Sequence, residues 1–321
     1  MGLQSKPRRH EVRCVSPVGL HRMAYQEWGD PESPRVVICV HGLTRISDDF
    51  GALAVALAPQ CRVVCPDVVG RGRSSWLQDP RLYGVPQYTS DMVTLIARLG
   101  VDRVQWVGTS MGGLIGMALA AMPDSPVSTL VMNDVGAQLS GKALARIAGY
   151  VGLQTQFATI EEAHTKLRQI FSGFGPHSED QWQQIINSVL VPLSDQPGFR
   201  VHYDPAIAEP FRIAYGAAGA QTATQTHDAS GHGGQAGQAG QTFEQTAPPD
   251  MNLWPLYDAI RIPTLVLRGK QSDLFSAQVL NEMASRGPRA QTVEFEGVGH
   301  APSLMHADQI RVVKSFLDQH A

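Results

Sequence analysis

The chain has 321 residues, of which 43% are hydrophobic and 17% are charged, enough for one large α/β domain with an insertion or for two ordinary domains. Its net charge of −3 argues against a nucleic-acid partner, which would require a basic face. The sequence shows neither a membrane-spanning apolar run nor a secretory signal pattern. We therefore expect a cytoplasmic protein without stable membrane anchoring, and the sequence leaves open whether it forms a homo-oligomer.

Strand and helix patterns alternate through the first 140 residues. Short runs rich in β-branched residues, such as RVVICVHG at 35–42, lack polar alternation, as expected of strands buried on both faces. Between these runs, apolar residues recur at helical spacing, most clearly from Tyr88 to Leu99, where Gly100 ends the pattern. The alternation predicts an α/β fold with a mostly parallel sheet and helices on both faces. The expected strands are residues 11–16, 20–29, 35–42, 61–67, 104–108 and 128–134, and the expected helices are residues 48–58, 86–99 and the segment after Ser110.

The pattern changes over residues 141–211, where the strand signal is weak. Capping boxes at Thr159–Glu162 and Ser178–Gln181 each precede apolar residues at helical spacing, which predicts an inserted group of helices. Strand patterns resume at residues 263–268 and 291–297, each followed by an expected helix. The insertion therefore divides one sheet domain in two along the chain.

We accordingly expect a core domain of residues 1–138 and 253–321 and a helical cap of residues 139–252. Within the cap, residues 216–249 are rich in Gly, Ala, Gln and Thr and are predicted to form a disordered loop, since they cannot bury enough apolar surface to order themselves. His227 and His232 lie in this stretch and could bind a metal, although a solvated linker is the favoured interpretation.

The sequence GTSMG at residues 108–112 lies between an expected strand and an expected helix. In that context G-x-S-x-G is typical of a nucleophile elbow, in which a strained turn exposes a serine at the carboxyl end of a strand. The glycines beside Ser110 allow close backbone approach, and the following helix points its positive N-terminus at developing negative charge. The same residues could also form an ordinary Gly/Ser turn that caps a helix.

A serine needs a positioned base to act as a nucleophile at neutral pH. Of the eleven histidines, His300 is favoured because it lies in a glycine-bracketed loop between an expected strand and a helix. An acid must orient this imidazole. We predict Asp273, because the order Ser, Asp, His places it after the strand nearest the histidine loop. Asp134, which ends the 128–134 strand, is the rival.

Two backbone N–H groups must stabilise the oxyanion of a tetrahedral intermediate. One is expected from Met111, directly after the serine, and the other from Leu43 in the sequence HGLTR, where Gly42 lets the backbone turn. We interpret His41 as a residue that fixes this loop by hydrogen bonding rather than as the general base.

The sequence DVVGRGRS at residues 67–74 also follows an expected strand. Its glycines suggest a phosphate-binding loop, but it lacks both the Gly-Lys-Ser/Thr and the G-x-G-x-x-G pattern. A tight structural loop near the site is the favoured interpretation. Arg71 and Arg73 could bind an anionic substrate, but solvated positions on the surface are expected for both.

Taken together, these motifs resemble the α/β-hydrolase family in their order along the chain. The matching pieces are HGLTR at 41–45, DVVGRGRSS at 67–75, GTSMGG at 108–113, Asp273 and GVGH at 297–300. The resemblance covers most of residues 20–138 and 255–319. It implies a Ser110–Asp273–His300 triad, a Leu43/Met111 oxyanion hole, a helical cap over the site, and no cofactor or metal.

The resemblance also narrows the expected chemistry. Epoxide hydrolases and haloalkane dehalogenases of this family carry an aspartate nucleophile, and neither the HGGG motif of many lipases nor the longer glycine-rich loop of ring-cleavage dienone hydrolases occurs in this sequence. It therefore implies a capped serine esterase or lactonase that cleaves a small-molecule ester, lactone or thioester through an acyl-enzyme. An acyltransferase, a C–C bond hydrolase and a non-catalytic binding protein remain alternatives. The expected pocket-lining residues include Ile147, Phe171, Trp182 and Phe211.

Overall fold

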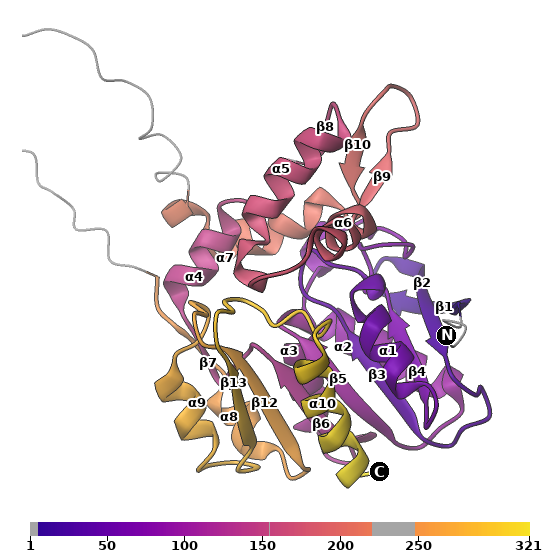
Figure 1. Cartoon of the computed structure of the whole chain (residues 1–321), viewed down its shortest axis with the longest axis vertical. Helices are drawn as coiled ribbons and strands as arrows, with labels where there is room; N and C mark the ends of the chain where they lie inside the picture. The colour runs from indigo at the N-terminus through magenta and orange to yellow at the C-terminus, as the bar shows by residue number, and fades with distance from the viewer. Residues whose placement is uncertain (1–5, 154, 220–247) are drawn as a thin grey trace, which may run out of the picture.

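The computed structural model describes residues 6–153, 155–219 and 248–321. Its central element is an eight-stranded sheet with the order β1-β2-β4-β3-β5-β6-β12-β13 (Figure 1). β2 pairs antiparallel with both β1 and β4, and the other neighbours are parallel. The predicted α/β fold with a mostly parallel sheet is therefore confirmed. The strands of this sheet are β1 Arg8–Ser16, β2 Gly19–Trp28, β3 Val36–Val40, β4 Arg62–Pro66, β5 Val104–Thr109, β6 Val127–Asn133, β12 Thr264–Gly269 and β13 Gln291–Phe295.

The central strands, such as β3, lack polar alternation because helices cover both faces of the sheet. Val37 and Cys39 of β3 belong to a core cluster with residues of α1 and α10. Ile38 and Val40 belong to a second cluster with residues of α2 and α3, and Figure 1 shows these two helix pairs on opposite sides of the sheet. The core helices are α1 Gly51–Leu57, α2 Val85–Leu99, α3 Met111–Ala120, α8 Trp254–Ala259, α9 Ala277–Met283 and α10 Ala307–Gln319, with short 3-10 helices η1 Ser47–Phe50 and η2 Pro80–Leu82.

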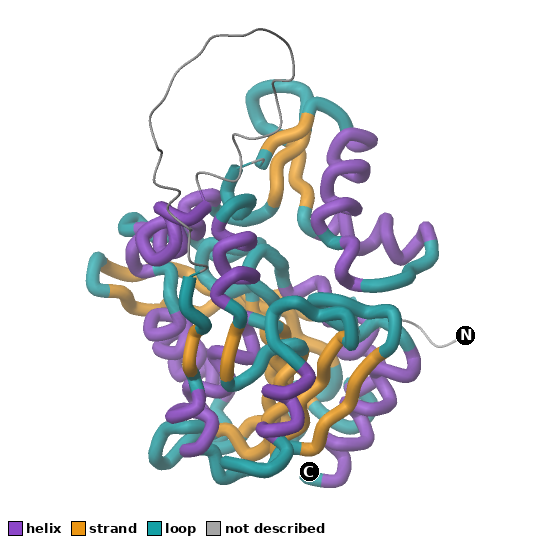
Figure 2. The backbone as a smooth tube through the Cα atoms, turned by 90° about the vertical axis from the view of Figure 1, so that its left-hand side faces the viewer, coloured by secondary structure: helices purple, strands orange, loops and turns teal. Residues whose placement is uncertain are grey.

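The elements between β6 and α8 lie together at one end of the sheet (Figures 1 and 2). They include a three-stranded sheet, β8-β10-β9, that the sequence analysis did not predict, because strands of two or three residues are too short to show a periodicity. These elements are β7 Gln138–Leu139, α4 Gly141–Ala148, β8 Gln156–Phe157, α5 Ile160–Ile170, η3 Ser172–Phe174, α6 Glu179–Ser188, β9 Leu190–Pro192, β10 Phe199–Val201, η4 Pro205–Ala208, α7 Glu209–Gly219 and β11 Met251–Asn252.

The short strands β7 and β11 pair antiparallel where the chain leaves the core and returns to it. We propose on this basis that residues 139–252 form a cap. The expected loop at 216–249 begins too early, because α7 continues to Gly219. Residues 220–247, with His227 and His232, lie outside the described part of the chain.

The two predicted capping boxes differ in detail. Ser178 and Gln181 form the reciprocal pair at the start of α6. At α5, the Thr159 side chain accepts the Glu162 N–H, but the Glu162 carboxylate accepts the N–H of Ala158 instead of completing the box. Within the described residues, no helix is long and apolar enough to cross a membrane.

Close packing of α3 on β5 leads to a stability prediction. A Cβ at Gly116 would overlap the Trp106 indole and crowd the Leu130 side chain, whereas a Cβ at Gly51 in α1 would meet no atom within 4 Å. We expect Gly116→Ala to lower the free energy of unfolding by about 1–3 kcal/mol through overpacking. The matched Gly51→Ala should leave it unchanged or raise it by up to about 1 kcal/mol. Denaturant unfolding of both variants tests this, and equal effects would contradict it.

Candidate active site

Ser110 sits on the turn between β5 and α3 with a strained backbone. Its φ is 51° and its ψ is −112°, in the positive-φ region that is unfavourable for residues other than glycine. A Cβ at Gly108 would overlap the Gly112 backbone, and a Cβ at Gly112 would overlap the Val40 carbonyl. The two glycines of the motif therefore allow the turn to pack against β3 while it presents the serine.

The serine is hydrogen-bonded to a histidine, which is hydrogen-bonded in turn to a buried aspartate. His300 Nε2 lies 3.0 Å from Ser110 Oγ, and His300 Nδ1 lies 2.6 Å from Asp134 Oδ2. With the carboxylate as acceptor, Nδ1 carries the proton and Nε2 is free to accept the serine hydroxyl. Asp134 is fully buried. Its carboxylate also accepts the Gly269 N–H at 2.8 Å and the Ser272 hydroxyl at 2.7 Å.

The predicted placement of Asp273 beside His300 is wrong. Asp273 is about half exposed and pairs with Arg146 of α4 at 2.8 Å. Beyond the end of β12 the chain turns Ser272 inward to Asp134, and the next side chain points away from it. The rival Asp134 is the residue that meets His300, because it directly follows β6, the strand next to β5. The sequence did contain a usable signal: Asp134 comes directly after a strand, whereas Asp273 lies four residues beyond the end of one.

The two residues expected to form the oxyanion hole both line the cavity in front of Ser110. Met111 is the first residue of α3, so its N–H has no partner within the helix. Within the described residues, neither the Leu43 nor the Met111 N–H donates a hydrogen bond. Two residues on the wall of the cavity that holds the serine therefore carry a backbone N–H that donates no hydrogen bond within the described part of the chain.

His41 fixes the loop that carries Leu43, as the sequence analysis expected. Its Nδ1–H donates to the Gly42 carbonyl at 2.7 Å, and its Nε2 accepts the Val68 N–H at 3.0 Å. His41 is fully buried, and this burial lowers its pKa to about 4, with a further lowering by the charge of Arg71. The neutral imidazole that results can donate at one nitrogen and accept at the other.

The expected surface position of Arg71 is wrong, because Arg71 is completely buried. Its Nε donates to the Leu43 carbonyl at 2.8 Å, one Nη donates to the Tyr88 hydroxyl at 2.9 Å, and the other lies 3.6 Å from Met111 Sδ. It thus braces the loop of Leu43 against the start of α3. The glycine-rich motif around it gave no signal for this role. Arg73 is partly exposed and pairs with Asp48 and Asp67.

A cavity of about 450 Å³ opens in front of Ser110 and His300, between the core and the proposed cap. Its lining is mostly apolar and includes Ile147, Phe171 and Phe211, as predicted. Trp182 is not among the lining residues. It is buried within the proposed cap, where it contacts His177 and Arg168. Among the described residues, the charged side chains on the cavity wall are those of Arg45, Asp48 and Asp49.

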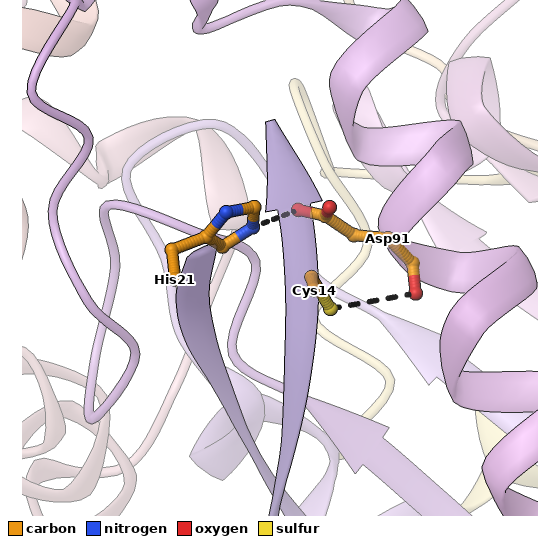
Figure 3. Close-up of side chains that lie close together, drawn as sticks. All are labelled: Cys14, His21 and Asp91. Carbon is orange, nitrogen blue, oxygen red and sulfur yellow. Dashed lines mark hydrogen bonds and ion pairs between the residues drawn. The ribbon is translucent and has the colours of Figure 1, made fainter. Parts of the chain in front are cut away.

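A second polar cluster lies at the other edge of the sheet, where Cys14, His21 and Asp91 bring possible metal-ligand atoms within 4.8 Å of one another (Figure 3). His21 Nε2 lies 2.9 Å from Asp91 Oδ2, and Gln87 donates to Asp91 Oδ1 at 2.7 Å. Burial raises the pKa of the Cys14 thiol to about 12, which disfavours the thiolate that binds metals. These contacts account for the cluster as a polar junction between the β1–β2 hairpin and α2.

Comparison with known proteins extends this picture. Residues 35–307 match the family model of the alpha/beta hydrolase fold. The 3-hydroxybutyrate-oligomer hydrolase of Cupriavidus necator is 46% identical over 316 residues, which span 98% of this chain and 99% of that protein. An alpha/beta hydrolase from Novosphingobium aromaticivorans superposes with a TM-score of 0.78 at 33% identity, covering 98% and 99% of the two chains. A Rickettsia typhi protein, 24% identical, shares the fold with a TM-score of 0.81 over 99% and 100% of the two chains.

The contact between Asp134 and His300 generates a prediction about the two aspartates. Asp134→Asn should lower kcat on short p-nitrophenyl esters by about 10³–10⁴-fold, because the amide no longer fixes the imidazole tautomer or stabilises its cation. Asp273→Asn loses only an exposed ion pair and should change kcat by less than about twofold. Steady-state kinetics on both purified variants decides the matter. A larger loss in Asp273→Asn would reverse the assignment.

The buried neutral His41 predicts a pH-dependent stability. In the unfolded chain His41 titrates near 6.5, and in the folded chain near 4. As the pH falls from about 6.5 to 4, His41 binds a proton in the unfolded chain but stays neutral in the folded chain. The free energy of unfolding therefore drops by roughly 3 kcal/mol. His41→Gln, which can still accept the Val68 N–H, should lose that part of the pH dependence. Denaturant unfolding of both proteins at pH 7 and pH 4 measures the drop, and an equal drop in the two proteins would refute the prediction.

Proposed function

The chain belongs to the α/β-hydrolase family, and from this premise we propose that it is a serine hydrolase of carboxylic esters, with oligomers of 3-hydroxybutyrate as substrates. The observation that carries the proposal is the hydrogen-bonded series Ser110, His300 and Asp134 at the wall of an apolar cavity. The substrate class rests on the relative from Cupriavidus necator, which is similar over almost its whole length.

In the first half of the proposed reaction, Ser110 Oγ attacks the ester carbonyl while His300 Nε2 takes the hydroxyl proton. Asp134 stays ionised and stabilises the imidazolium that forms. The carbonyl oxygen becomes an oxyanion, which accepts hydrogen bonds from the Leu43 and Met111 N–H groups. The imidazolium then protonates the leaving alkoxide oxygen, the C–O bond breaks, and the acyl group remains on Ser110.

In the second half, a water molecule replaces the alcohol. His300 removes a proton from this water as it attacks the acyl-enzyme, and the second oxyanion uses the same two donors. Collapse of that intermediate returns the proton to Ser110 Oγ and releases the carboxylic acid. The proposed cycle consumes only water and ester.

The apolar cavity suits this substrate class. A 3-hydroxybutyrate oligomer consists of short, methyl-bearing units joined by ester bonds, and the apolar wall can bury these units while the few polar groups orient the scissile ester. Most of the lining from the proposed cap is aliphatic or aromatic, including Ile147, Phe171 and Phe211.

The nucleophile is tested by Ser110→Ala. We expect this variant to lose at least about 10⁴-fold in kcat on p-nitrophenyl butyrate and on the 3-hydroxybutyrate dimer, and to escape labelling by a fluorophosphonate probe. Ser285→Ala, which alters an exposed serine at the end of α9, serves as the matched control and should behave as wild type. Retention of turnover by Ser110→Ala would exclude the mechanism.

A further experiment separates hydrolysis from acyl transfer. The wild-type enzyme should give a burst of p-nitrophenol, as expected if an acyl-enzyme accumulates, and should release free acid even when alcohols or thiols are added. If transfer to the added acceptor dominated over release of acid, the proposed hydrolase would be an acyltransferase.

A further inference from the structure

Arg45 places a buried guanidinium in the wall of the cavity that holds Ser110. Its Nε donates to Asp49 at 2.9 Å, and its Nη2 donates to Asp49 at 2.5 Å and to the Ile185 carbonyl at 3.0 Å. The guanidinium lies over Phe171 of the proposed cap, with Cζ 4.6 Å from the ring centroid. Arg45 is only 5% exposed.

One end of this guanidinium has no partner. Within the described part of the chain, Arg45 Nη1 is buried and makes no hydrogen bond. Asp49 occupies one edge of the planar group, and the two N–H bonds of Nη1 lie in the same plane at its other end. Buried donors of a charged group are unfavourable when unpaired, so this corner is suited to an acceptor that arrives with a ligand.

Arg45, with its unpaired Nη1, lies on the loop beside Ser110. The Arg45 N–H donates to the Gly42 carbonyl at 3.2 Å, which closes the turn that carries Leu43. A Cβ at Gly42 would lie 3.8 Å from both Arg45 Cγ and Ser110 Cβ. The stem of Arg45 and the nucleophile therefore flank the same glycine.

Two acidic residues also line the cavity, and both are paired. Asp49 is held by Arg45, and Asp48 is held by Arg73 at 3.2 Å. A substrate carboxylate would be repelled wherever it met these acids alone, whereas at Nη1 it would face unpaired positive donors. Nη1 is itself fully buried, so a carboxylate would reach it when neighbouring side chains shift, and it would then be the favourable place for an anion in a mostly apolar cavity.

We propose that Arg45 Nη1 binds the free carboxylate at the end of the substrate, a proposal that rests on the ester hydrolysis proposed above. In an oligomer of 3-hydroxybutyrate, only two carbons separate the last ester oxygen from the terminal carboxylate. An anchored carboxylate places this last ester beside Ser110. The enzyme therefore cleaves from the carboxylate end: the anchored unit leaves as the alcohol, free 3-hydroxybutyrate, while the remainder forms the acyl-enzyme.

The test compares the 3-hydroxybutyrate dimer with its methyl ester, which has the same scissile bond but no charge. We expect wild-type kcat/KM to favour the acid by about 30- to 100-fold and Arg45→Met to bring the ratio near one, through loss of a charge-assisted hydrogen bond. Arg45→Lys should restore part of the preference. Since both substrates use the same triad, a partly inactive preparation does not alter the ratio.

Two further variants serve as controls. Arg81→Met removes an exposed arginine paired with Asp79 and should keep the wild-type ratio. The double variant Arg45→Met with Asp49→Asn leaves no unpaired carboxylate and should show the same loss of preference as Arg45→Met, which separates substrate recognition from a disturbed fold.

The outcomes are distinguishable. If the chain cleaves p-nitrophenyl butyrate at Ser110 but does not prefer the acid, or if Arg45→Met lowers both substrates equally, the role of Arg45 is overturned while the proposed function stands. If neither p-nitrophenyl butyrate nor the dimer is cleaved, both proposals fall.

Discussion

The geometry of the site depends on one buried charge, the carboxylate of Asp134. A buried carboxylate is costly unless donors surround it, and here the donors come from three places: the end of β12, the loop after it, and the loop that carries His300. Satisfying this one group therefore ties together segments more than a hundred residues apart in sequence. The same hydrogen bonds determine which nitrogen of His300 faces the serine.

A second buried charged group, the guanidinium of Arg71, also joins separate segments near the serine. Arg71 contacts Leu43 and Met111, whose N–H groups donate no hydrogen bond among the described residues. His41 fixes the loop of Leu43 through the Gly42 carbonyl and the Val68 N–H. The loop that carries His300 is also held by the proposed cap, because the Gly299 N–H donates to the Gly173 carbonyl at 2.7 Å. The proposed cap therefore contacts the loop of His300 as well as lining the cavity.

These fixed polar groups explain how a mostly apolar cavity could support the proposed polar reaction. In the proposed reaction, charge develops at the oxyanion and at the imidazole, next to donors and acceptors that the fold already holds in place, so little reorganisation would be required. In the proposal for Arg45, the charge of the substrate is likewise received by a group whose other donors are already occupied. Apolar walls then provide affinity, and a few placed donors provide orientation.

The sequence by itself determined the features that local chemistry enforces. The elbow around Ser110 needs glycines at neighbouring positions, buried strands need unbroken apolar runs, and a histidine loop between strand and helix is visible as a pattern, so the fold and the residues Ser110 and His300 could be predicted. Only the tertiary structure decided between Asp134 and Asp273, because the strands before both aspartates end at the same edge of the sheet. The choice depended on a loop that turns Ser272 inward and Asp273 outward. The burial of Arg71 likewise could not be predicted from the sequence, since its partners lie on segments that meet only in the folded chain.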